Sequence, residues 1–130
     1  MGYAFVFPGQ GAQYVGMGLA LAQAYPEAAQ VFEQADEALG RSLTKLITDG
    51  PDEELKLTWN TQPAILTASV ACLRALNAAC DLKPLAMAGH SLGEYSALVA
   101  AGAMDFSDAV RVVEKRGQLA LRGGLGADGV

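Results

Sequence analysis

The chain has few of the residues that bind metals or form crosslinks. Its 130 residues include a single histidine, His90, and two cysteines, Cys72 and Cys80. A metal site needs several such ligands at short spacings, so this composition argues against one. The cysteines are eight positions apart in an apparent helix, about 12 Å by helical rise, which is too far for a disulfide. We expect both thiols to be reduced and packed in the core of a cytoplasmic protein.

Positive charge and long apolar runs are also scarce. Nine lysines and arginines against 14 acidic residues give a formal net charge of −5, which argues against nucleic acid as a partner. No apolar run is long enough to cross a bilayer. The first run, residues 3–7, is too short for a signal peptide and no basic region precedes it. A hydrophobic share of 52% instead predicts a globular chain of one domain's size with a buried core.

Short apolar runs alternate with longer helical patterns, which is typical of an α/β fold. Residues 3–7 and 85–88 predict two parallel strands. We expect helices over residues 26–39, 52–54, 61–79 and 94–102, and one more helix after Asp105. Gly40 would cap the first of them at its C-terminus, and Asp105 would cap the last at its N-terminus. The helix over residues 61–79 is apolar on nearly all sides, so protein should cover it all round. In the last helix Ala109, Val110, Val112 and Val113 should pack inward.

Residues 89–93 read Gly-His-Ser-Leu-Gly, between the second predicted strand and the next helix. This is the pattern of a nucleophile elbow. Gly89 and Gly93 allow the strand and the helix to pass closely. Ser91 would be strained at the helix N-terminus, where unpaired N–H groups favour a developing negative charge. The alternative is a tight structural turn, because the pentapeptide alone matches other strand–helix loops.

A serine nucleophile also needs donors for the oxyanion. One donor would be the backbone N–H of Leu92, the residue after the nucleophile. The second would come from the glycine loop at residues 9–13, with Gln10 as its provider. That loop does not fit a dinucleotide-binding turn, because Tyr14 stands where the third glycine is needed. It does not fit a phosphate loop either, because no Gly-Lys-Ser/Thr follows.

The base and the role of Arg116 are harder to assign from spacing. His90 precedes the nucleophile and should point to the opposite side of the strand, so we interpret it as a packed or hydrogen-bonded histidine beneath the turn. Arg116 has two readings of equal weight. It is either a surface cation near a helix end, or it faces Ser91 and pairs with a substrate carboxylate through its planar fork.

Four segments carry a family resemblance. They read Phe-Pro-Gly-Gln-Gly-Ala-Gln at residues 7–13, Thr-Gln-Pro-Ala at 61–64, Gly-His-Ser-Leu-Gly-Glu-Tyr at 89–95, and Arg-Gly at 116–117. In this order and spacing they closely resemble the malonyl-CoA:acyl carrier protein transacylases of bacterial-type fatty acid synthesis. The likeness extends to about residue 121 and is far more specific than the serine pentapeptide alone.

The resemblance implies a ping-pong acyl transfer. Ser91 would take the malonyl group from coenzyme A as an ester, and the phosphopantetheine thiol of acyl carrier protein would then remove it. Gln10 and Leu92 would supply the oxyanion-hole N–H groups, and Arg116 would bind the malonyl carboxylate. The coenzyme A thioester is a substrate, and no permanently bound cofactor is implied. His90 belongs to the family's motif but is not its catalytic histidine.

The chain departs from the family in length. Members are more than twice as long, with a hydrolase-like parallel-sheet domain that carries an inserted ferredoxin-like subdomain. Their catalytic histidine and the glutamine that orients it lie in the later half. We therefore expect residues 1–121 to be a partial, mostly helical acyltransferase α/β domain with two strands and a nucleophile elbow, and residues 122–130 to be a frayed glycine-rich tail. Exposed strand edges and helix faces would favour self-association.

Two other functions remain open from the sequence. An esterase of the α/β-hydrolase type would share the serine turn, although the glutamine-bearing loop and Arg116 speak against it. A fragment that only binds coenzyme A or carrier protein would fit the lone histidine.

Overall fold

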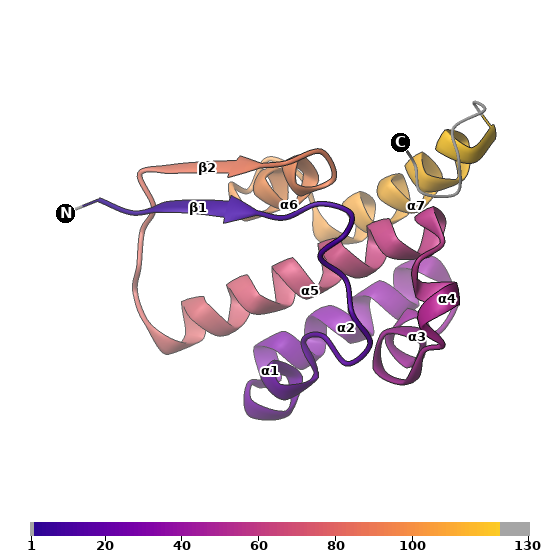
Figure 1. Cartoon of the computed structure of the whole chain (residues 1–130). Helices are drawn as coiled ribbons and strands as arrows, with labels where there is room; N and C mark the ends of the chain where they lie inside the picture. The colour runs from indigo at the N-terminus through magenta and orange to yellow at the C-terminus, as the bar shows by residue number, and fades with distance from the viewer. Residues whose placement is uncertain (1, 123–130) are drawn as a thin grey trace.

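The computed structural model describes residues 2–122 as two short strands and seven helices (Figure 1). The elements are β1 (Ala4–Phe7), α1 (Leu19–Ala24), α2 (Pro26–Leu39), α3 (Leu43–Asp49), α4 (Asp52–Leu55), α5 (Thr58–Ala79), β2 (Ala86–Gly89), α6 (Gly93–Ala100) and α7 (Phe106–Arg122). The fold is thus mostly helical with a two-stranded sheet. Helix α7 includes the first residue of the tail expected at residues 122–130, and the rest of that tail lies outside the described residues.

The two strands are parallel and in register. Ala4 pairs with Ala86 and Phe7 pairs with Gly89, so both strands end at the same edge of the sheet. All five helices between them belong to the connection, which is the kind of long crossover that parallel pairing requires. The loop after β1 and the turn after β2 therefore emerge side by side.

Helix α5 is the centre of the packing. It lies between the strand pair and helices α1 and α2 (Figure 1), and it also packs against α6 and α7. Thirteen of its 22 residues are buried, which explains its apolar character on nearly all sides. Cover is incomplete toward its C-terminal half, where Cys72 is exposed. The helix begins at Thr58, three residues before the expected start. Pro63 therefore lies inside the helix, near its N-terminus, and does not mark its first turn.

Several local signals in the sequence are confirmed. Helix α2 begins with Pro26 and ends before Gly40, which caps it at φ 68°, a conformation that glycine adopts without steric cost. Asp105 accepts a hydrogen bond from the backbone N–H of Asp108 at 3.3 Å, near the start of α7. Acidic residues occupy the first turn of α4, where they complement the helix dipole.

Two burial predictions are wrong. Cys72 and Cys80 are both exposed and not packed in the core. Cys80 follows the last residue of α5, and Cys72 faces an open cavity between α5 and β1. Val112 is 42% exposed, whereas Ala109, Val110 and Val113 are fully buried. The period of 3.6 residues per turn places Val112 outside the stripe of its neighbours.

The packing of α7 on α5 depends on a glycine. A side chain added at Gly117 would place its Cβ 2.7 Å from the Cα of Trp59 and 2.8 Å from the carbonyl oxygen of Thr58. Both are backbone atoms of α5 and cannot move aside as a flexible side chain would. The two helices thus cross in close contact at this point, and Arg41 strengthens the position of α7 through an ion pair with Glu114 at 2.8 Å. None of the helices in the described part of the chain is long and apolar enough to cross a membrane.

We expect Gly117→Ala to destabilise the fold. Alanine gains about 1 kcal/mol of helix propensity over glycine, but overpacking against rigid backbone costs typically 1–3 kcal/mol or more. The expected net loss is about 1–2 kcal/mol in the free energy of unfolding, measured by urea titration with circular dichroism. Lys115→Ala, an exposed change on the same helix, is the control and should change stability by less than about 0.5 kcal/mol. A Gly117 variant that is about 1 kcal/mol more stable than the native chain, as helix propensity alone predicts, would refute the close contact.

Candidate functional site

The turn between β2 and α6 brings the backbone of three segments together. Strand β2 ends at Gly89 and helix α6 begins at Gly93. A Cβ added at Gly89 would overlap the backbone of Gly93, and one added at Gly93 would overlap the carbonyl of Phe7. The sequence therefore needs glycine at both positions, because strand and helix pass without room for a side chain.

Ser91 is the strained residue of this turn. Its φ is 53°, and it is the one non-glycine residue with positive φ among those described. Such a conformation costs a side-chain-bearing residue roughly 1–3 kcal/mol and persists only where the surroundings fix it. Here the residues on both sides are fixed by hydrogen bonds. The N–H of His90 donates to Phe7 at 3.2 Å, and the N–H of Glu94 donates to Ser91 at 3.1 Å.

Arg116 of α7 reaches Ser91 across the sequence. Its Nη2 donates a hydrogen bond to Ser91 Oγ at 3.2 Å, and its Nη1 donates to Gln62 Oε1 at 2.9 Å. The guanidinium carbon also lies 5.6 Å from the centre of the Tyr95 ring, within the range of a cation–π interaction. The structure therefore shows that Arg116 faces the serine, and its pairing with a substrate carboxylate stays a prediction.

The glycine loop after β1 lies beside the serine turn, as the parallel register requires. Gln10 Nε2 donates to Thr58 Oγ1 in the first turn of α5 at 3.4 Å. The side chain of Leu92 is 1% exposed and anchors the start of α6 in the core. Within the described residues no backbone carbonyl accepts a hydrogen bond from the Leu92 N–H, which leaves this donor available beside Ser91.

His90 is exposed at the surface, so of the two alternatives, packed or hydrogen-bonded beneath the turn, the packed one is wrong. The reason is its position: the paired part of β2 ends at Gly89, so His90 lies beyond the sheet and keeps an exposed side chain. Its ring lies alongside the loop after β1, with Nδ1 3.5 Å from a Cβ built at Gly9. In the described residues, no hydrogen bond joins its ring to Ser91.

Sequence reasoning did not assign Gln62, Tyr95 or Thr58 to the site. Each contacts a predicted site residue: Gln62 and Tyr95 contact Arg116, and Thr58 contacts Gln10. The sequence did contain one local signal that could have pointed to two of them. Thr58 and Gln62 are polar residues in a helix that is otherwise apolar on most sides, and they are one turn apart on the same face. Both are buried, at 1% and 4% exposure.

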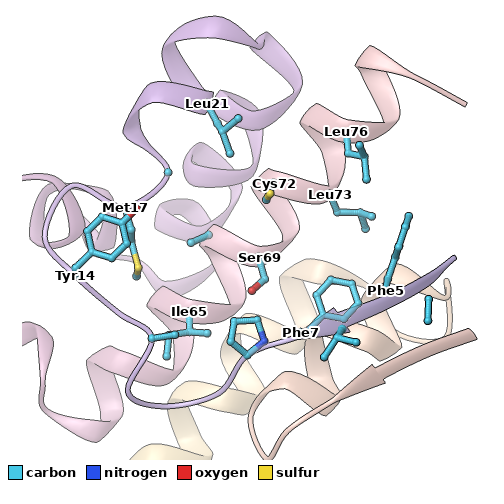
Figure 2. Close-up of a pocket in the computed structure, with 16 residues that line it drawn as sticks. Phe5, Phe7, Tyr14, Met17, Leu21, Ile65, Ser69, Cys72, Leu73 and Leu76 are labelled. Atoms are coloured by element: carbon cyan, nitrogen blue, oxygen red, sulfur yellow. The ribbon is translucent and has the colours of Figure 1, made fainter. Parts of the chain in front are cut away.

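A separate cavity of about 480 Å³ lies between β1 and α5 (Figure 2). Its lining includes Phe5, Phe7, Ile65 and Leu73, and none of the four predicted site residues. All five residues from Ala4 to Pro8 contribute to it. Because alternate side chains of a strand point to opposite faces, contact with consecutive residues means that this cavity follows the free edge of β1.

The described residues offer a polar site with a cation and no metal ligand cluster. No three histidine, cysteine, aspartate or glutamate side chains gather there as a metal would require. The site holds a serine hydroxyl, a guanidinium and a backbone N–H at a helix start, which together suit an anionic group or a developing oxyanion.

Comparison with known proteins places this geometry in a family. The acyl transferase domain family matches residues 4–127. The malonyl CoA-acyl carrier protein transacylase of Escherichia coli strain K12 is 57% identical over 116 residues, which are 89% of this chain and 38% of the relative.

Solved structures agree with the sequence match. The malonyl CoA-acyl carrier protein transacylase of Coxiella burnetii superimposes with a TM-score of 0.91 and 51% identity, over 93% of this chain and 38% of that one. A malonyl-transacylase solved in complex with a type II PKS acyl-carrier protein has a TM-score of 0.90 and 52% identity, over 94% of this chain and 40% of that one. The chain thus spans about two fifths of the length of these relatives, and it belongs to the acyl transferase domain family.

Proposed function

We propose that this chain carries the acyl-accepting part of a malonyl-CoA:acyl carrier protein transacylase site. The observation that supports this most is the hydrogen bond from Arg116 Nη2 to Ser91 Oγ. A malonyl ester on Ser91 would hold its free carboxylate only a few atoms from Oγ, within reach of a guanidinium that already contacts that oxygen. Arginine is suited to this role because its planar fork binds a carboxylate through two parallel hydrogen bonds.

The turn at residues 89–93 would act as a nucleophile elbow. Its support is the positive φ of Ser91 at the start of α6, where backbone N–H groups lack helical partners. Ser91 Oγ would attack the thioester carbonyl of malonyl-CoA, and the oxyanion would accept hydrogen bonds from the N–H groups of Leu92 and Gln10. Collapse of this intermediate would break the C–S bond and release coenzyme A as the thiol. Attack by the phosphopantetheine thiol of a carrier protein would reverse these steps.

Among the described residues, no side chain that could act as a general base lies at Ser91. Arginine is a donor only and cannot accept the serine proton, and His90 is exposed at the rim of the sheet. In the family that the sequence resembles, the catalytic histidine lies in the later half. We therefore infer that acylation by these 130 residues alone proceeds slowly, through transfer of the proton to water or buffer. The alternative function, binding of coenzyme A or carrier protein without chemistry, follows if no acylation occurs.

We also propose that the 130-residue chain self-associates when it is alone. In the part of the chain that the structure describes, β1 has only β2 as a partner strand, so its other edge is open, and an apolar cavity lies next to it. Val6 on this strand is 75% exposed, and Tyr3 and Leu85 at the start of the sheet are 53% and 82% exposed. An open edge with exposed apolar side chains favours pairing with another chain.

Ser91→Ala should abolish covalent labelling by malonyl-CoA. Intact-mass measurement after incubation should show one malonyl adduct on the native chain and none on this variant, because the variant lacks the attacking oxygen. Ser69→Ala is the matched control, since Ser69 lies on α5 at the separate cavity, and it should label like the native chain. An unmodified native chain would favour the binding-only alternative.

Arg116→Ala should weaken labelling by malonyl-CoA more than labelling by acetyl-CoA. A charge-assisted hydrogen bond contributes about 1.5–3 kcal/mol, so the malonyl-to-acetyl ratio should fall by about tenfold or more. Arg111→Ala provides the control, because Arg111 lies on the same helix and pairs with Asp108 at the surface. Equal slowing of both acyl donors would remove the carboxylate-binding role.

Val6→Lys should reduce self-association. Sedimentation at micromolar concentration should show oligomers of the native chain and mostly monomers of this variant, because an edge lysine opposes strand pairing. Leu119→Lys changes an equally apolar residue, 50% exposed on α7, and should leave the oligomers intact. A native chain that is monomeric under these conditions would contradict the proposal.

A further inference from the structure

The side chain of Gln62 is a buried polar group in an apolar helix. It is 4% exposed and lies near the start of α5, among neighbours that form the hydrophobic core. A buried amide without hydrogen bonds is costly, so its partner indicates why it is there. Its Oε1 accepts a hydrogen bond from Arg116 Nη1 at 2.9 Å.

This bond fixes the direction of the guanidinium. An arginine side chain has several rotatable bonds and about 2 kcal/mol of rotamer entropy. With Nη1 held by Gln62 and one face of the group near the Tyr95 ring, Nη2 is directed at Ser91 Oγ at 3.2 Å. The amide thus sets the plane of the fork at the place where an acyl group on Ser91 would lie.

The partner of Arg116 is also neutral, unlike those of two other arginines in the described residues. Arg41 pairs with Glu114 at 2.8 Å, and Arg111 pairs with Asp108 at 2.7 Å. A carboxylate partner offsets the charge of its arginine. The carbonyl oxygen of Gln62 accepts the hydrogen bond without adding a negative charge, so the full charge of Arg116 remains available to an anionic ligand.

We propose that Gln62 is a positioning residue that orients Arg116 toward the acyl group on Ser91 and keeps its charge uncompensated, and so sets the preference for acyl groups that end in a carboxylate. The proposal rests on the proposed function of Arg116 as the carboxylate ligand. It adds that the preference depends on a buried amide of a different helix, 54 positions away in the sequence.

Two variants separate orientation from charge. Gln62→Met retains the length of the side chain but removes the acceptor, so Arg116 should lose its fixed orientation. Gln62→Glu retains the acceptor and adds a negative charge, so Arg116 should stay in place with its charge offset. Asn60→Leu is the matched control, because Asn60 is a buried amide of the same helix whose Nδ2 donates to the carbonyl of Glu54 at 2.9 Å.

The first measurement needs no acyl donor. The rate at which phenylglyoxal modifies Arg116, followed by peptide mass mapping, should rise about fivefold in Gln62→Met, as expected for the loss of one hydrogen bond of about 1 kcal/mol. It should not rise in Gln62→Glu. Asn60→Leu should leave the rate near that of the native chain, with circular dichroism melts confirming that the variants compared are folded.

The second measurement is the ratio of malonyl to acetyl adducts on Ser91. We expect this ratio to fall about tenfold in both Gln62 variants. Gln62→Met would leave Arg116 without a fixed orientation, and Gln62→Glu would offset its charge. The ratio should stay unchanged in Asn60→Leu. A merely structural role of Gln62 would slow both donors alike.

The outcomes distinguish the two proposals. If the native chain forms no adduct, the proposed function of this chain fails, while phenylglyoxal still decides whether Gln62 orients Arg116. An unchanged modification rate in Gln62→Met, or an equal rise in Asn60→Leu, overturns the positioning role. If Gln62→Met does not fold, a faster rate in Gln62→Glu than in the native chain overturns it. An unchanged adduct ratio in both Gln62 variants overturns the link to acyl preference.

Discussion

The contact between α5 and α7 at Gly117 is the constraint on which the candidate site depends. The absence of a side chain there allows the backbones of the two helices to meet next to Thr58 and Trp59. Arg116 is the adjacent residue, so the same contact sets the depth at which its side chain leaves α7 and reaches Gln62 and Ser91. A larger residue at position 117 would move the cation away from the serine even if every polar group were unchanged.

The serine turn depends on a second close approach. Gly89 and Gly93 leave no space between the end of β2, the start of α6 and the carbonyl of Phe7. Because the backbone on both sides is fixed, Ser91 keeps a conformation that is unfavourable for a residue with a side chain. The two parallel strands thus place the serine turn and the glycine loop at one edge of the sheet. Helix α7 contributes the Arg116 guanidinium to the same place, and α5 contributes Gln62, which accepts its hydrogen bond.

The least covered part of the described fold lies along β1. The cavity along β1 and the exposed Val6 belong to the free edge of a sheet that has only two strands in the described residues. The matched relatives are about two and a half times as long as the part that aligns, since the chain spans 38% of the transacylase of Escherichia coli. The strained serine and its cation are nevertheless assembled within residues 2–122, because every contact among Gln62, Ser91, Tyr95 and Arg116 is made inside this part of the chain.

The sequence by itself determined the local secondary structure and the sharp turn that carries Ser91. Short apolar runs predicted both strands, and a 3.6-residue period closed by Gly40 predicted the bounds of α2, because these signals act over a few residues. The spacing of glycines around Ser91 likewise predicted the sharp turn, and the glycine loop predicted where Gln10 would lie. Local patterns did not predict exposure at Cys72, His90 and Val112, since exposure depends on which neighbours pack against a face.

Only the tertiary structure decided that Arg116 faces Ser91 and revealed its partners. The distance along the chain from Gln62 to Arg116 is 54 residues, and from Ser91 to Arg116 it is 25. No periodic pattern relates such positions, because their proximity comes from the angle and depth at which α7 crosses α5. That crossing is set by the missing side chain at Gly117, whose importance is visible only when the backbone of α5 lies against it.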